Sequence, residues 1–145
     1  MIPRVDTVAF FDALADEMNT HPERFELLGA ADMVAEVVMT RPEGDFRVRF
    51  AFEGTGCSGV TEVEGDGAPD SDFRLIGPLA AWQAMFEDIA TNGRATGLYT
   101  INSLALLGDK IACVGDDPMG LDKFSRFNQS LQEFLDGACQ VPVGA

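Results

Sequence analysis

The stretch "ADMVAEVVMTRPEGDFRVRFAFEG", residues 31 to 54, contains two runs rich in valine, methionine and phenylalanine, separated by the turn "RPEG". In residues 46 to 53, phenylalanine or valine alternates with arginine, alanine or glutamate. Successive side chains of a strand point to opposite faces of a sheet, so this alternation predicts one apolar and one polar face. The stretch therefore predicts a β-hairpin with one buried face.

Two helices are predicted before the hairpin. Apolar residues between Val8 and Met18 recur at helical spacing, and Asp6 lies where the N-cap of this helix is expected. The segment "NTHPERFELLG", residues 19 to 29, predicts a second, short helix, because its proline suits the first helical position and its glycine ends the run.

Short strands and a helix are predicted directly after the hairpin. The segments "GVTEVEGD" (59–66) and "DFRLIG" (72–77) predict a third and a fourth strand, joined by the loop "GDGAPDSD". Pro78 is expected at the first position of a helix whose apolar stripe extends over residues 79–89. The segment "TNGRATG", residues 91 to 97, interrupts the helical pattern.

The last third of the chain predicts a helix, a strand and a long helix. The segment "LYTINSLALLG", residues 98 to 108, favours a helix, and residues 110 to 114 favour a strand. Asp117 is a predicted N-cap, and the apolar stripe that follows it ends at Gly137. This order of elements predicts an α+β fold with an about five-stranded, mostly antiparallel sheet covered on one face by helices.

Length, composition and charge limit the possible functions. With 145 residues, 46% hydrophobic and 23% charged, the chain is predicted to form one domain over residues 1–145, with 137–145 as a tail. The formal net charge of −14 opposes contact with phosphates, so we expect no nucleic-acid partner and no unaided docking on anionic lipid. No apolar run is long enough for stable membrane insertion, and "MIPRVDTVAFFDALADEM" lacks the apolar core of a signal peptide.

Residues able to carry chemistry are few. Cys57, Cys113 and Cys139 are odd in number and form no CxxC motif, which favours reduced thiols in a cytoplasmic protein. The only histidine, His21, precedes a proline at a helix start, so a solvated position is favoured over a catalytic one. The spacings of a zinc site, a calcium loop and a phosphate loop are not found. We therefore expect no metal, no cofactor and no catalytic residue.

The remaining feature is the content of aromatic residues and methionine: 11 Phe, one Trp, one Tyr and six Met. A filled core explains them, and so does the wall of a cavity for an irregular apolar ligand, because Met and Phe adapt to such ligands. Arg47 and Arg49 alternate with the phenylalanine face and are expected to point away from it. Arg94, in the interrupting loop, is a candidate for the mouth of a cavity.

Two segments resemble the sterol carrier protein 2-like family. "DFRLIGPLAAWQAMF", residues 72 to 86, is similar to the strand, Gly-Pro turn and Trp-bearing helix of that family. "GDKIACVGDDPMGLDKFSRF", residues 108 to 127, is similar to its closing strand, Gly-Asp turn and apolar helix. The resemblance is clearest over residues 72–127, and the order of elements extends it to residues 5–136.

The resemblance implies a carrier that binds a sterol, a fatty acyl chain or a similar bulky apolar lipid in a tunnel between the sheet and the helices. The segment 90–108 is longer than its counterpart in the family, and it is compatible with either lining the tunnel or closing it. The residues expected in the tunnel wall are Phe50, Phe52, Trp82, Met85, Phe86, Ile101, Leu104, Met119, Phe127 and Leu131.

Two other functions remain open. A small isomerase or hydrolase would place a carboxylate base in an apolar cavity. An accessory subunit of a lipid or quinone pathway would have a filled core and an exposed apolar patch. The carrier hypothesis implies an apolar small molecule as partner and an enzyme as a possible recipient, and a homodimer is compatible with all three hypotheses.

Overall fold

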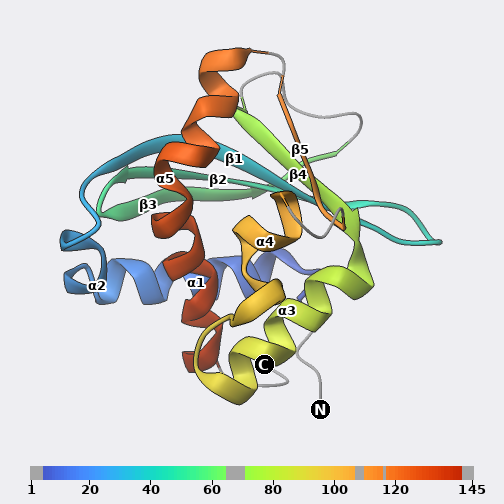
Figure 1. The fold of residues 1–145 in the computed structure, drawn as a ribbon, viewed down its shortest axis with the longest axis horizontal. Helices are drawn as coiled ribbons and strands as arrows, with labels where there is room; N and C mark the ends of the chain where they lie inside the picture. The colour runs from blue at the N-terminus through green and yellow to red at the C-terminus, as the bar shows by residue number, and fades with distance from the viewer. Residues whose placement is uncertain (1–4, 65–70, 107–109, 116, 142–145) are drawn as a thin grey trace.

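The computed structural model describes residues 5–64, 71–106, 110–115 and 117–141. These residues form a five-stranded sheet with helices packed against one face (Figure 1). The strands are β1 (Ala31–Thr40), β2 (Phe46–Gly54), β3 (Gly56–Glu62), β4 (Phe73–Pro78) and β5 (Ala112–Val114). The helices are α1 (Val8–Thr20), α2 (Glu23–Glu26), α3 (Leu79–Asn92), α4 (Ile101–Leu106) and α5 (Pro118–Asp136), with short 3-10 helices η1 (Gly97–Tyr99) and η2 (Gly137–Gln140).

The sheet has the strand order β3-β2-β1-β4-β5. β1 and β2 form the predicted hairpin, in which Val37 lies opposite Val48, and the pairs β2–β3 and β4–β5 are also antiparallel. β1 and β4 run parallel, and Leu75 lies beside Val37. The predicted α+β fold with a mostly antiparallel sheet is confirmed, and the parallel pair lies inside it.

The helix-covered face of the sheet is closed by aromatic side chains. Phe50 of β2 stacks on Phe11 of α1 with ring centroids 6.0 Å apart and on Phe134 of α5 at 4.8 Å. All three rings are at most 1% exposed. α5 crosses in front of α1 (Figure 1), and the ring contacts of Phe50 join both helices to β2.

The other face of the sheet carries charge, as the alternation predicts. Arg47 lies on this face with one guanidinium nitrogen 3.6 Å from the carboxylate of Glu36 on β1. Glu36 is fully buried. Arg49 is paired in register with Glu36 across the β1–β2 ladder. The arginines thus point away from the phenylalanine face.

α5 approaches the sheet closely at Gly120. A Cβ atom at this position would collide with the backbone carbonyl oxygen of Asp72, just before β4. The carboxylate of Asp72 accepts hydrogen bonds from the Val34 N–H of β1 at 2.8 Å and from the Lys123 ammonium of α5 at 3.4 Å. Because Gly120 has no side chain, α5 can lie this close to the backbone of Asp72.

Three predicted boundaries in the first half of the chain are wrong. Pro22 is the N-cap of α2 rather than its first helical residue. Thr7, rather than Asp6, caps α1: its hydroxyl accepts a hydrogen bond from the Phe10 N–H at 3.2 Å. Asp6 instead pairs with Arg41 at 3.0 Å. β3 begins at Gly56 rather than at the predicted residue 59, because Gly56 and Cys57 pair with the end of β2.

In the second half of the chain, the observed boundaries of the elements differ less from the predicted ones. Pro78 is the N-cap of α3 rather than its first helical residue. The predicted helix over 98–108 divides into η1 and α4, and η2 begins the predicted tail. Asp117 caps α5 as predicted, since its carboxylate accepts a hydrogen bond from the Met119 N–H at 3.0 Å. The predicted loop 65–72, the end of the 98–108 helix and the end of the tail fall partly outside the described residues.

Candidate functional site

An apolar pocket of about 620 Å³ lies between α3, η1, α4 and the residue at position 110. Three alanines of α3 form one wall, and larger side chains of η1 and α4 form another. The residues that line it are Pro78, Ala80, Ala81, Ala84, Leu98, Tyr99, Leu104 and Lys110. Its size lies within the range of roughly 300–1,000 Å³ that is usual for small-molecule sites.

Small side chains on one face of α3 create this hollow. Ala80 and Ala84 are four residues apart and therefore lie on the same helical face. The opposite face of α3 carries Trp82, Met85 and Phe86, which are at most 2% exposed and belong to the core. The large side chains of α3 thus pack in the core, whereas the small side chains on its other face leave space for the pocket.

Two large apolar side chains at the pocket are exposed to solvent. Leu98 is 69% exposed and Tyr99 is 45% exposed, and both belong to η1. A ligand in the pocket would remove part of this apolar surface from water, which is favourable at about 25 cal/mol per Å².

The wall segment, residues 95–104, is fixed by side chains of α3 and α5. Asp88 of α3 accepts hydrogen bonds from the Thr96 N–H at 2.6 Å and from the Thr96 hydroxyl at 3.0 Å. The side-chain oxygen of Gln132 on α5 accepts one from the Ile101 N–H at 2.7 Å. The position of this wall is therefore set by polar contacts in addition to packing.

Asp136, at the end of α5, completes these contacts. One of its carboxylate oxygens accepts hydrogen bonds from the Ala95 N–H at 3.0 Å and from the Gln132 amide at 2.9 Å. Burial raises the pKa of this carboxyl, and the two hydrogen bonds partly oppose that effect. Asp136 does not line the pocket. It is therefore placed to hold the wall and not to act as a base on a bound molecule.

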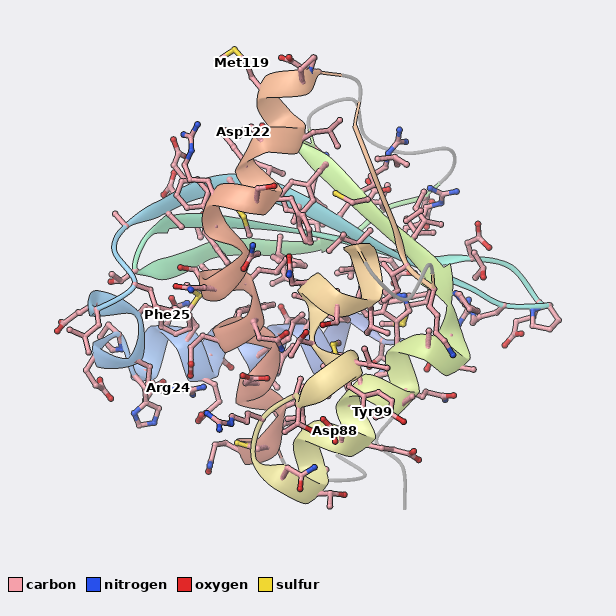
Figure 2. All side chains as sticks on the ribbon, in the orientation of Figure 1. Arg24, Phe25, Asp88, Tyr99, Met119 and Asp122 are labelled. Atoms are coloured by element: carbon pink, nitrogen blue, oxygen red, sulfur yellow. The ribbon has the colours of Figure 1, made fainter. Side chains whose placement is uncertain are left out.

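The ten predicted wall residues lie in different places. Leu104 lines the pocket. Met119 is 77% exposed at the far end of α5 (Figure 2), and Phe127 is half-buried at a kink in that helix. The core, at no more than 2% exposure, contains Phe50, Phe52, Trp82, Met85, Phe86, Ile101 and Leu131.

Sequence reasoning missed the alanines and the positive charge of this pocket. Arg94, the predicted mouth residue, does not line it, whereas Lys110 does. The available signal for Lys110 was its rarity, since lysine occurs only at positions 110 and 123. The alanines gave no signal, because alanine is common on every kind of helical face.

The other candidate chemical groups lie outside this pocket. Burial raises the pKa of the Cys57 thiol, and it raises that of Cys113 to about 11, so both thiols are protonated at neutral pH. His21 is partly exposed and lies 3.2 Å from Glu23, as expected for a solvated helix-entry residue. Among the described residues, no group of three or more His, Cys, Asp or Glu side chains could hold a metal ion. Within the same part of the chain, none of the helices combines the length and apolarity needed to cross a bilayer.

A second hollow of about 420 Å³ is polar. It lies between the ends of α1, α3 and α5 and is lined by Glu17, His21, Arg24, Gly93, Glu133, Cys139 and Gln140. Arg24 and Glu133 form an ion pair at 2.6 Å within it. Because an apolar ligand would bury these charged side chains without replacing their hydration, this hollow is a poorer site for such a ligand than the first.

Known structures share this fold. A conserved hypothetical protein from Thermus thermophilus, described as possibly a sterol carrier protein, matches with a TM-score of 0.71 at 20% identity over 95% of this chain and 90% of its own. A crystal structure of sterol carrier protein 2 matches with a TM-score of 0.71 at 19% identity over 96% of this chain and 100% of its own. Sterol carrier protein 2 from Yarrowia lipolytica, in its apo form, gives a TM-score of 0.46 at 14% identity, over 84% and 88% of the two chains. No family model and no curated protein sequence matches the chain. The chain therefore has the fold of sterol carrier protein 2, as the resemblance predicts.

Proposed function

We propose that the chain binds a bulky apolar molecule, such as a sterol or a fatty acyl chain, in the pocket between α3, η1 and α4, and acts as its carrier. The observation that carries this proposal is the apolar pocket of about 620 Å³ with Leu98 and Tyr99 exposed beside it. Two solved proteins with this fold are described as a sterol carrier or possibly one.

Burial of the ligand supplies enough free energy without specific polar contacts. Removing a chain of about 16 methylenes from water gains on the order of 10 kcal/mol, at about 0.8 kcal/mol per methylene. Loss of translational freedom and ordering of the ligand offset several kcal/mol of this gain. Micromolar binding is therefore reachable for an apolar chain or ring system.

Lys110 gives the pocket a preference for ligands with a negatively charged end. It is the charged residue among those that line the pocket, in a chain with a net charge of −14. A carboxylate at the end of a ligand would approach this ammonium against an otherwise repulsive field. We therefore propose that a fatty acid binds with its carboxyl end toward Lys110.

Titration with two fluorescent probes, cis-parinaric acid and dehydroergosterol, tests the proposal. The variant Ala84→Trp fills the pocket and is expected to weaken binding of either probe by about tenfold or more. Ala90→Trp adds the same side chain at an exposed position of α3 outside the lining, so it is the matched control and should bind as the wild type does.

A third variant separates the contribution of the Lys110 charge to binding from the contribution of apolar contact. Lys110→Met keeps the length of the side chain and removes its charge, so it should weaken cis-parinaric acid several-fold and leave dehydroergosterol unchanged. Wild-type protein that binds neither probe would refute the carrier proposal and favour an accessory subunit. Equal binding by the Ala84→Trp and Ala90→Trp variants would place the ligand elsewhere.

A further inference from the structure

We propose that Gln132 and Asp136 form a latch that positions the wall segment of the pocket, and that this latch holds more tightly when the Asp136 carboxyl is neutral. The latch is defined by three hydrogen bonds: Ala95 N–H to Asp136, Ile101 N–H to Gln132, and the Gln132 amide to Asp136. Its pocket function rests on the ligand site proposed above, whereas the latch itself can be tested without a ligand.

The two side chains act as one unit because Gln132 joins both contacts. They are four residues apart on α5, so they lie on the same face of that helix. Ala95 and Ile101 bracket Leu98 and Tyr99, the exposed apolar residues of the pocket. Both ends of η1 are thus tied to α5, and loss of the latch would leave the hydrogen bonds from Thr96 to Asp88 as the polar contacts that hold the pocket wall.

The latch occupies a site where a charge is costly. Asp136 is 9% exposed, and Ala95 is 7% exposed. A buried carboxylate is favourable only as far as hydrogen bonds and positive charges replace its lost hydration. Here one oxygen receives two neutral donors.

The charged groups near Asp136 do not offset the free-energy cost of ionising its buried carboxyl. Glu133, on the same helix, opposes ionisation of Asp136, and Arg24 of α2 favours it. Arg24 is itself committed to Glu133, with a nitrogen–oxygen distance of 2.6 Å. Glu17 of α1 faces the neighbouring Gly137 and adds a further acidic group on that side. The wall segment contributes no charge of its own over residues 95–104, and Arg94 just before it is exposed.

Thermodynamic linkage between proton binding by Asp136 and closure of the latch gives the direction of the pH effect. Burial raises the pKa of Asp136 in the closed latch, and opening to water would return the carboxyl to its ordinary value. A group with a higher pKa in the closed state binds its proton more tightly there, so proton uptake favours closure. The wall is therefore held more firmly in acid, and it loosens as the pH rises through the raised pKa.

Amide hydrogen exchange of the whole chain tests the latch directly. Protection of the Ala95 N–H, corrected for intrinsic exchange, should fall in the wild type as the pH rises from below the ordinary aspartate pKa of 3.8 through the raised pKa of Asp136. Asp136→Asn keeps an oxygen that can accept both hydrogen bonds and removes the charge. This variant should show a flat profile and, at neutral pH, about threefold or more slower exchange than the wild type.

Two controls keep the result interpretable. Asp88→Asn changes a carboxylate in the same way at the Thr96 anchor, which lies outside the latch, and should retain the pH dependence at Ala95. Gln132→Ala removes the acceptor of the Ile101 N–H, so this amide should exchange faster at every pH. The latch is refuted if Asp136→Asn keeps the wild-type profile, or if Gln132→Ala leaves exchange at Ile101 unchanged.

Release of cis-parinaric acid links the latch to the pocket. At neutral pH the Asp136→Asn variant should release the probe about threefold or more slowly than the wild type. Exchange that follows the latch prediction in a protein that binds no probe would refute the proposed ligand site and support the latch. A bound probe whose release is the same in both proteins would show that the latch does not control the pocket, and would overturn that part of the inference.

Discussion

Two regions of the helical layer, a closed end and an open end, differ in how densely their side chains pack. At one end, the Phe50 ring stacks on the rings of Phe11 and Phe134, and all three are at most 1% exposed. At the other end, Ala80 and Ala84 face η1 and α4 across a pocket of about 620 Å³. Large aromatic side chains fill the closed end, whereas alanines on one face of α3 leave the open end unfilled.

The forces that hold the two ends differ as well. Aromatic pairs at the closed end combine apolar burial with favourable ring geometry, and both terms depend on dense packing. The open end cannot use packing across its hollow. There the wall segment is held by hydrogen bonds from its backbone to Asp88, Gln132 and Asp136. This contrast predicts large stability effects at one end and large ligand effects at the other.

The largest loss of stability is expected at the closed end. Phe50→Ala removes a ring that is 1% exposed and leaves a cavity between two other rings, so the free energy of unfolding should fall by about 3–5 kcal/mol. Leu27→Ala, at a side chain 99% exposed, is the control and should change it by less than about 0.5 kcal/mol. Urea denaturation measures both, and a loss below about 1 kcal/mol for Phe50→Ala would break the contrast.

A smaller loss is expected where α5 meets the sheet. Gly120→Ala introduces a Cβ against the Asp72 carbonyl oxygen and forces α5 away from β4, at a cost of about 1–3 kcal/mol. Helix propensity alone would predict a gain of up to about 1 kcal/mol from this substitution. Thermal or chemical unfolding that shows such a gain would mean that the helix can move freely there. Ser125→Ala, at an exposed position of α5, provides the baseline.

The next effect depends on pH and concerns the junction between the two ends. Burial raises the pKa of Asp136, so its contribution to stability is fully present below the ordinary aspartate pKa of 3.8 and is lost as the pH rises through the raised value. Asp136→Asn should therefore be more stable than the wild type at neutral pH and should lose this advantage in acid. Unfolding curves at several pH values check this, and a variant destabilised at neutral pH would contradict it.

The smallest stability effect is expected at the open end. Leu98→Ala removes a side chain that is 69% exposed, so the free energy of unfolding should change by no more than about 0.5 kcal/mol. Binding of dehydroergosterol should nevertheless weaken several-fold, because Leu98 lines the pocket. A loss of stability comparable to that of Phe50→Ala, with binding intact, would remove the distinction between the two ends.

Local patterns predicted the elements of this fold well. The alternation over residues 46–53 indicated β2 and its two faces, and Asp117 marked the start of α5. The cap of α1 was predicted one residue early, because aspartate and threonine are both good N-caps and adjacent here. The split of residues 98–108 into η1 and α4 was missed; the two are separated at Thr100, whose backbone is extended, and the Ile101 N–H that follows it binds the side chain of Gln132 on α5.

The candidate site was much less accessible to such reasoning. Ten apolar residues were chosen for the wall, but a phenylalanine in a core and one in a cavity have the same sequence pattern. Only the packed structure shows that Leu104 reaches the pocket while Phe50 does not. The hollow arises where side chains are small, and small side chains give no periodic apolar signal.

By itself, the sequence determined which segments become strands and helices, which face of each is apolar, and that the whole is acidic, because these properties depend on neighbours a few residues apart. The tertiary structure alone decided the parallel pairing of β1 with β4, the place of the pocket and the contacts of its wall. Asp136 and Ala95 are 41 residues apart, and Gln132 and Ile101 are 31 apart. No local pattern encodes such pairs, because they form only when packing of the core brings α5 beside the segment that follows α3.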